Sequence, residues 1–265
     1  MLKLIAKVIA GIILLLVVVI AGAIISMGAH VPDALYQPSP SAMVRTADND
    51  SSYLVIGGRK GAGLEVIKVL RARGERVTAV IRPSSLTPEK TDHLKDLGVE
   101  LVAGDATNPD DMALVFNNGN YLAVVSTIGC FSCEPPTDYL GNKIITDATK
   151  LAGVKRIIQV SSIGAGDSFN TAPWLSRNAL AKVLPLKTQA EEYLVASELD
   201  YTIIRPGGLK SGTASGYGYL SENRDAFGFI DRTDLARLIV GALDDDESIG
   251  KTYHAADESR TWIFQ

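Results

Sequence analysis

The sequence predicts an α/β protein whose doubly wound parallel sheet is preceded by a single N-terminal transmembrane helix. Three observations support this fold class. Short apolar runs alternate with stretches of helical periodicity from Tyr53 onward, a glycine-rich turn follows the first run, and an uncharged apolar stretch occupies residues 8–27. We therefore expect a transmembrane anchor at residues 1–27, a linker at 28–52 and an α/β domain at 53–265.

The N-terminal stretch at residues 8–27 is long enough, as a helix, to span a bilayer and predicts a single-pass membrane protein. The alternative is a cleaved signal peptide, whose apolar core is normally shorter. Lys3 and Lys7 precede the stretch and only Arg45 follows it, which is a weak orientation signal. The side of the membrane that holds the main domain stays open. Residues 28–52 are rich in Pro, Ser and Asp, which is typical of a linker.

The main domain is expected to contain short buried strands separated by helices. Residues 64–74 and 139–153 have apolar side chains at helical spacing. This alternation is typical of a parallel sheet that is covered on both faces and binds ligands at the carboxyl ends of its strands. The expected strands are 53–57, 76–81, 99–104, 121–127, 156–162 and 201–206.

Composition excludes some function classes. The net charge is −4 and no basic tract exists, so nucleic acid is not an expected partner. The three histidines, His30, His93 and His254, are scattered along the chain, and no metal site is predicted.

The glycine-rich turn GGRKGAG, residues 57–63, follows a predicted strand and opens a predicted helix. Gly57 permits the tight turn, and Gly58 continues it. Gly61 and Gly63 let the backbone approach a pyrophosphate and let the helix pack on the strand. The helix N-terminus then faces the anion. The turn therefore predicts a Rossmann domain that binds a dinucleotide.

The charges around this turn favour NADPH over NADH. An NAD site would place an acidic residue near the end of the second strand, where this chain has Arg82. Arg59 and Lys60 lie in the turn itself. Three cations at one corner suit a 2′-phosphate, whereas the alternative interpretation is solvated surface charge.

The domain resembles the short-chain dehydrogenase/reductase superfamily over residues 53–257, and in particular its atypical, NmrA-like branch, which includes biliverdin-reductase-B-like proteins. GGRKGAG matches the superfamily spacing G-x-x-x-G-x-G, and GDATNPDDM resembles its adenine-side motif. LKTQAEEYLVASELDYTIIRPGGL, residues 186–209, is the most specific match, and FIDRTDLA, residues 229–236, matches a late helix start.

The resemblance implies roles for several residues. Asp105 and Ala106 are implied to lie against the adenine, and Lys187 is implied to bind the nicotinamide ribose. The resemblance also implies that the turn formed by Pro206, Gly207 and Gly208 holds the nicotinamide carboxamide.

Residues at the ends of the fourth and fifth predicted strands are further candidates. Thr127 and Gly129 are expected to line the diphosphate–nicotinamide stretch of the cofactor. Ser161 and Ser162 end a buried strand on the ligand side, where hydroxyls can bond a substrate carbonyl or merely close the strand. We prefer Ser162 as the catalytic serine and assign Ser161 to the cofactor.

One position departs from the family pattern Tyr-x-x-x-Lys. Lys187 is present, but Val183 stands where the tyrosine belongs, and valine cannot transfer a proton. One interpretation is a reductase of a conjugated or lipophilic acceptor, whose proton comes from water, from Ser162 or from the substrate. The other is a non-catalytic NADPH-binding sensor or an accessory subunit of a membrane complex. We favour the reductase, with Ser162 and Lys187 as its catalytic residues.

The two cysteines, Cys130 and Cys133, follow the fourth predicted strand as C-F-S-C. Two cysteines are too few for a disulfide scaffold, and zinc would need a second pair. A redox dithiol is the alternative to an incidental pair of loop cysteines, which is the favoured interpretation.

Overall fold

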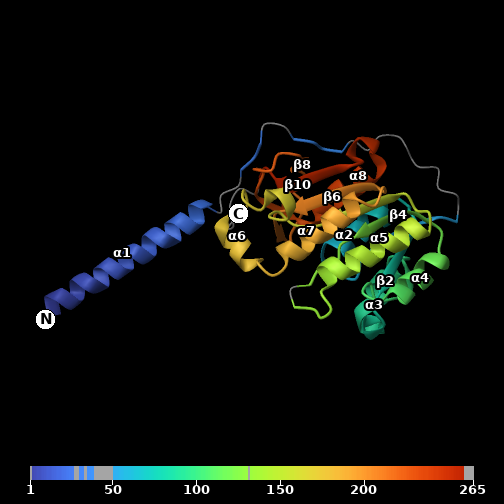
Figure 1. Cartoon of the computed structure of the whole chain (residues 1–265), viewed down its shortest axis with the longest axis horizontal. Coiled ribbons are helices and arrows are strands. Elements are labelled where there is room, and N and C mark those ends of the chain that lie inside the picture. Colours follow the sequence, from blue (N-terminus) through green and yellow to red (C-terminus); the bar gives the residue numbers. More distant parts are fainter. Residues whose placement is uncertain (1, 27–29, 33–34, 39–49, 131, 260–265) are drawn as a thin grey trace.

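The computed structural model describes residues 2–26, 30–32, 35–38, 50–130 and 132–259. Its main body is a Rossmann-like α/β domain, and helix α1 (Leu2–Ser26) extends away from this body (Figure 1).

The domain is built on an eight-stranded sheet. Its strands are β1 (Ser52–Ile56), β2 (Val77–Ile81), β3 (Glu100–Ala103), β4 (Tyr121–Ser126), β5 (Arg156–Val160), β6 (Asp200–Pro206), β8 (Gly218–Ser221) and β10 (Lys251–Asp257). Their order is β3-β2-β1-β4-β5-β6-β10-β8. All neighbours pair in parallel except β10 and β8. The predicted parallel sheet is therefore confirmed, with an antiparallel edge strand added to it. A separate parallel pair joins β7 (Gly208–Lys210) to β9 (Phe229–Asp231).

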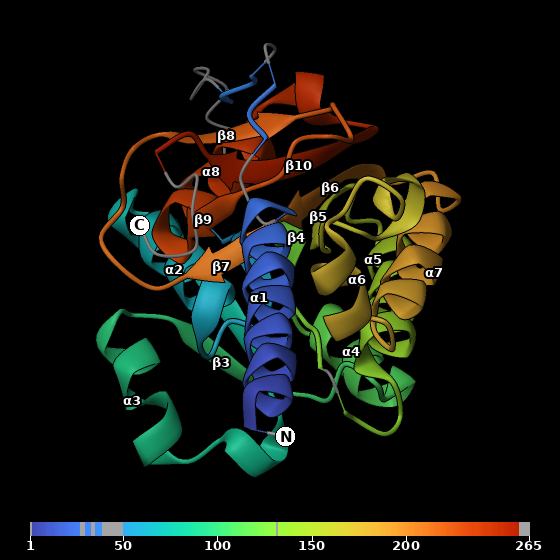
Figure 2. The same ribbon diagram turned by 90° about the vertical axis from the view of Figure 1, so that its left-hand side faces the viewer.

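Helices cover both faces of the sheet (Figure 2). The first face carries α2 (Gly61–Ala72), α3 (Pro88–Asp96) and α8 (Arg232–Asp244), and the second carries α4 (Pro109–Asn117), α5 (Asn142–Leu151) and α7 (Leu184–Val195). Successive strand residues point to opposite faces. Val55 accordingly packs in the first core, whereas Leu54 and Ile56 pack in the second.

Short elements connect these layers. The helix α6 (Trp174–Ala179) precedes α7, and a π-helical turn, η2 (Thr137–Gly141), runs directly into α5. Three 3-10 turns complete the described elements: η1 (Pro83–Ser85), η3 (Gly166–Ser168) and η4 (Asp246–Ser248).

The expected single-pass membrane localisation is corrected by the structure. Among the residues described, none of the helices has both the length and the apolar character needed to cross a membrane. The transmembrane anchor expected at residues 1–27 is therefore not supported, and the single-pass membrane localisation is withdrawn.

Part of the segment predicted as a linker contacts the domain. His30 and Tyr36 form antiparallel bridges with Phe227 and Leu220, so this arm lies along the edge of the sheet. The Tyr36 ring also stacks on Tyr253 with 5.2 Å between ring centroids. This packing gives His30 and Tyr36 a structural role at the sheet edge.

Candidate functional site

A cavity of about 460 Å³ opens at the carboxyl ends of β1, β2, β4, β5 and β6. The strand order reverses between β1 and β4, which is the switch point where ligands bind in open α/β sheets. Most of the residues that the sequence proposes for the site are in its lining. The predicted site residues that line the cavity are Gly57, Arg59, Lys60, Gly61, Arg82, Asp105, Ala106, Thr127, Gly129, Ser161, Ser162, Lys187, Pro206 and Gly207.

The glycine-rich turn forms one end of the cavity. Gly57 has φ of +92°, and a Cβ built there would lie 2.7 Å from Thr127 Oγ1. A Cβ at Gly63 would lie 2.5 Å from the same oxygen. Lys60, which precedes α2, makes no side-chain capping bond to the helix. The first N–H groups of α2 are therefore not capped by this side chain, which suits an anion such as a diphosphate.

Three predicted binding residues lie behind the cavity wall. A Cβ at Gly58 would lie 2.5 Å from the Ile67 side chain, and one at Gly208 would collide with the ring of Phe229. Gly63 packs under the turn against Thr127. These glycines let the backbone approach its neighbours closely, so they shape the site without lining it.

Arg59, Lys60 and Arg82 line the same end of the cavity, together with Ser85. The carboxylate of Asp105 accepts hydrogen bonds from the Thr107 N–H at 2.9 Å and from the Thr107 hydroxyl at 2.8 Å. These bonds hold the Asp105 carboxylate within its own loop. The charged side chains left at the corner where a ribose 2′-substituent would lie are therefore mainly cations.

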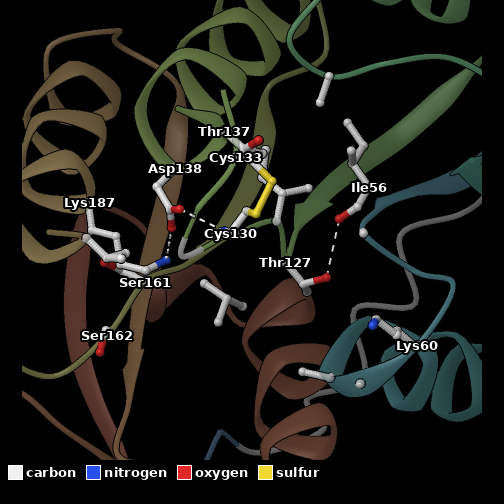
Figure 3. A pocket seen from close by; sticks show the side chains of 18 of the residues that line it. Ile56, Lys60, Thr127, Cys130, Cys133, Thr137, Asp138, Ser161, Ser162 and Lys187 are labelled. Carbon is white, nitrogen blue, oxygen red and sulfur yellow. Dashed lines mark hydrogen bonds and ion pairs between the residues drawn. A yellow bond between two sulfur atoms is a disulfide. The ribbon is translucent and has the colours of Figure 1, made fainter. Parts of the chain in front are cut away.

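The other end of the cavity holds an ion pair that the sequence did not reveal. The Lys187 ammonium lies 2.9 Å from Asp138 Oδ1 (Figure 3). The Asp138 side chain is fully buried, and its Oδ2 accepts the N–H of Cys130 at 2.8 Å. Asn142 donates to the Asp138 carbonyl at 2.8 Å and fixes η2 in place. Asp138 precedes a stretch that reads as a packing helix, so no local pattern marks it.

Val183 occupies the position expected for the missing tyrosine. It lines the cavity one helical turn before Lys187, whose N–H donates to the Val183 carbonyl at 3.0 Å. Its side chain is 4% exposed. An apolar group therefore fills the place of the family's proton donor, and three leucines join it in the lining: Leu180, Leu184 and Leu209.

The two candidate serines differ in their bonding. The Ser162 hydroxyl donates to the Ile163 carbonyl at 3.0 Å, which is how a serine closes a strand end. The Ser161 hydroxyl is buried and has no hydrogen-bond partner among the residues described. Since buried hydroxyls are normally bonded, an unpartnered one in the cavity wall fits a site that receives a polar ligand.

Cys130 and Cys133 are joined by a disulfide, and both line the cavity beside Asp138 (Figure 3). The cysteine pair therefore belongs to the lining of the cavity.

Sequence comparison agrees with this geometry. The model of a family described as NAD(P)H-binding matches residues 57–246. An uncharacterised chloroplastic protein of Arabidopsis thaliana is 33% identical over 73% of this chain and 72% of its own length. The photosystem II assembly factor Ycf39 of Guillardia theta is 26% identical over 76% of this chain, and the match spans 63% of that relative.

Comparison with solved structures gives the same result. ChuY, described as an anaerobillin reductase from Escherichia coli O157:H7, matches with a TM-score of 0.69 and 29% sequence identity. The match covers 78% of this chain and 98% of ChuY. The resemblance to the atypical, NmrA-like branch of the reductase superfamily is thereby confirmed.

Proposed function

This chain belongs to the NAD(P)H-binding family, and on that premise we propose that it is an NADP(H)-dependent oxidoreductase that reduces a conjugated or lipophilic acceptor without a catalytic tyrosine. One observation carries the proposal. A single cavity has a glycine-rich turn with flanking cations at one end and the Lys187–Asp138 pair beside Val183 at the other.

The residues of this cavity suit NADPH. The N-terminus of α2 and the glycine-rich turn would hold the diphosphate. Arg59, Lys60 and Arg82 would bind the 2′-phosphate through charge-assisted hydrogen bonds. Lys187 would hold the nicotinamide ribose, and the unpartnered hydroxyl of Ser161 offers a further hydrogen bond. When bound, NADPH supplies a hydride.

The acceptor end of the cavity lacks the family's tyrosine, and Val183, Leu184 and Leu209 give its lining an apolar part. Val183 gives no proton, so the side-chain alternatives to water are the hydroxyls of Ser161 and Ser162 and the ammonium of Lys187. Acceptors such as quinones, flavins and tetrapyrroles need less help, because their conjugated systems spread the negative charge that arrives with the hydride. The apolar lining favours such lipophilic molecules, and the similarity to a reductase of anaerobillin supports a reductase.

Repeated turnover tests this function. The full chain is incubated with NADPH and a panel of quinones, flavins and linear tetrapyrroles, and NADPH oxidation is followed at saturating acceptor. We expect many equivalents of NADPH to be oxidised per protein with at least one acceptor. Lys187→Ala should slow this oxidation, because the cofactor loses a ribose contact.

A second candidate is a non-catalytic NADPH-binding assembly factor or sensor. Two observations favour it: Val183 removes the usual proton donor, and the chain is similar to the assembly factor Ycf39. Tight NADPH binding without oxidation beyond one equivalent, across the whole panel, would replace the reductase with this function.

A further inference from the structure

We propose that Cys130–Cys133 is a redox-active site: an external dithiol reduces this disulfide, and its redox state sets how tightly the neighbouring cavity binds NADPH. The inference rests on the proposed function, because the controlled ligand is the proposed cofactor. It assigns to these cysteines a role that the proposed reaction itself does not use.

The disulfide is accessible. Both cysteines are partly exposed, and Ser132 between them is exposed, as are Glu134 and Pro135 that follow. The disulfide thus lies at the mouth of the cavity rather than in either apolar core.

The disulfide is coupled to the cofactor site through hydrogen bonds. It staples the loop that leaves β4, and Thr127, Gly129 and Cys130 of this loop line the cavity. The N–H of Cys130 donates to Asp138 Oδ2, and Asp138 Oδ1 pairs with the Lys187 ammonium (Figure 3). One short chain of contacts therefore connects the disulfide to the lysine proposed to hold the ribose.

The packing around this chain is tight. A Cβ at Gly129 would lie 3.0 Å from Asp138 Oδ1 and 3.4 Å from Lys187 Nζ. The loop backbone therefore bears directly on the ion pair, and a change in the loop is transmitted to both charges.

The chemistry is a thiol–disulfide exchange. A thiolate of the external dithiol attacks one sulfur of the disulfide, the Cys130–Cys133 bond breaks, and a mixed disulfide forms. The second thiol of the reductant then resolves this intermediate. The reductant becomes a disulfide, and the two electrons and two protons it gives up leave Cys130 and Cys133 as free thiols.

Reduction should weaken NADPH binding for two reasons. Without the staple the loop samples more conformations, so binding must order it again. The buried Asp138 carboxylate also loses the fixed N–H of Cys130 and depends more on Lys187, which is then less available to the ribose. We expect the Kd for NADPH to rise about tenfold on reduction, which corresponds to about 1.4 kcal/mol.

The test uses the full chain. NADPH is titrated by fluorescence into the oxidised protein, into protein treated with dithiothreitol, and into protein reoxidised after that treatment. Alkylation followed by mass spectrometry counts free thiols, with no background because the chain has only these two cysteines. Hydrogen exchange of residues 127–138 reports the loop without any nucleotide. The control variant carries Cys130→Ser and Cys133→Ser.

On reduction we expect two free thiols, faster hydrogen exchange of the loop and about tenfold weaker NADPH binding, and reoxidation should reverse all three. The control variant should bind NADPH as the reduced parent does, and dithiothreitol should not change its affinity. Resistance of the disulfide to dithiothreitol in the native protein overturns the proposal, as does an unchanged Kd with both thiols free. Absence of NADPH binding in both states refutes the proposed function instead. In that case the hydrogen exchange of the loop tests whether the disulfide is redox-active. Faster exchange on reduction supports a redox-active disulfide, and unchanged exchange refutes it.

Discussion

At the scale of single residues, Lys187 and Asp138 form an ion pair in the lining of the cavity. A buried carboxylate is costly unless it is paired and hydrogen-bonded, and Asp138 has both kinds of partner. The lysine lines the cavity beyond this pair, so its remaining N–H donors can reach a ligand.

Lys187→Ala should therefore weaken NADPH binding. A hydrogen bond to a charged group contributes about 1.5–3 kcal/mol, which is roughly a tenfold to hundredfold change in Kd. Ser162→Ala is the matched control, because the Ser162 hydroxyl donates to a backbone carbonyl and should leave binding nearly intact. Calorimetry of both variants measures the difference. A Lys187→Ala protein that binds NADPH as tightly as the parent would show that this lysine does not hold the ribose.

His254 should make stability depend on pH. It is fully buried, its Nδ1–H donates to the Ala226 carbonyl at 2.7 Å, and burial lowers its pKa to about 4. The unfolded chain, with a histidine pKa of about 6.5, takes up the proton first. Stability from this group is therefore complete above about pH 6.5 and is lost as pH falls towards 4, by about 2 kcal/mol between pH 7 and pH 5.

Urea unfolding at pH 7 and at pH 5 checks this expectation. His254→Asn should flatten the pH dependence across this interval, whereas the exposed His93→Asn should preserve it. A parent protein that is equally stable at both values would contradict the assignment.

At the scale of elements, the glycine-rich turn depends on close contact between β1, α2 and the loop after β4. Gly63→Ala places a Cβ 2.5 Å from Thr127 Oγ1 and 2.6 Å from the Gly57 carbonyl oxygen. Overpacking of this kind costs about 1–3 kcal/mol, and shifting the turn should abolish NADPH binding.

Gly153→Ala is the control for this variant, since it has φ of +71° and no heavy atom within 4 Å of an added Cβ. It should lose stability through backbone strain alone and bind NADPH normally. Thermal unfolding and NADPH titration of the two variants separate the effects, and normal binding by Gly63→Ala would refute the role of the turn.

Sequence periodicity predicted β1, β2 and β5, because their apolar runs are buried on both faces of the sheet. The edge formed by β10 and β8 was not predicted. KTYHAAD in β10 buries His254 and Asp257 among small residues, and β8 has four residues, so neither shows a clear apolar period.

The site shows the same division. Motif spacing placed the glycine-rich turn, Arg82 and Lys187 around one cavity. The pairing of Asp138 with Lys187 emerged only from the structure, because this contact depends on how the segment after β4 packs against α7. Local sequence does not encode which buried carboxylate a distant lysine meets.

At the scale of the whole molecule, the N-terminal arm closes the exposed edge of the sheet. The Tyr36 hydroxyl donates a hydrogen bond to the Asp245 carboxylate. Burial and this hydrogen bond raise the pKa of Tyr36. Tyr36→Phe should lower the free energy of unfolding by about 0.5–1.5 kcal/mol and leave NADPH binding unchanged, because the arm lies outside the cavity lining.

The exposed Tyr217→Phe is the matched control and should not change stability. Chemical denaturation of the full chain measures both variants. Equal stability of Tyr36→Phe and the parent would show that the arm's side-chain contact contributes nothing to the fold.

One cavity is proposed to bind NADPH through its glycine-rich turn and flanking cations. The test is titration of NADPH and NADH into the full chain and into Arg82→Asp. A charge-assisted contact contributes about 1.5–3 kcal/mol, so the parent should bind NADPH at least tenfold more tightly than NADH. Arg82→Asp should reduce or reverse this preference. Equal affinity of the parent for the two nucleotides, or an unchanged preference in Arg82→Asp, would show that these cations do not bind a 2′-phosphate.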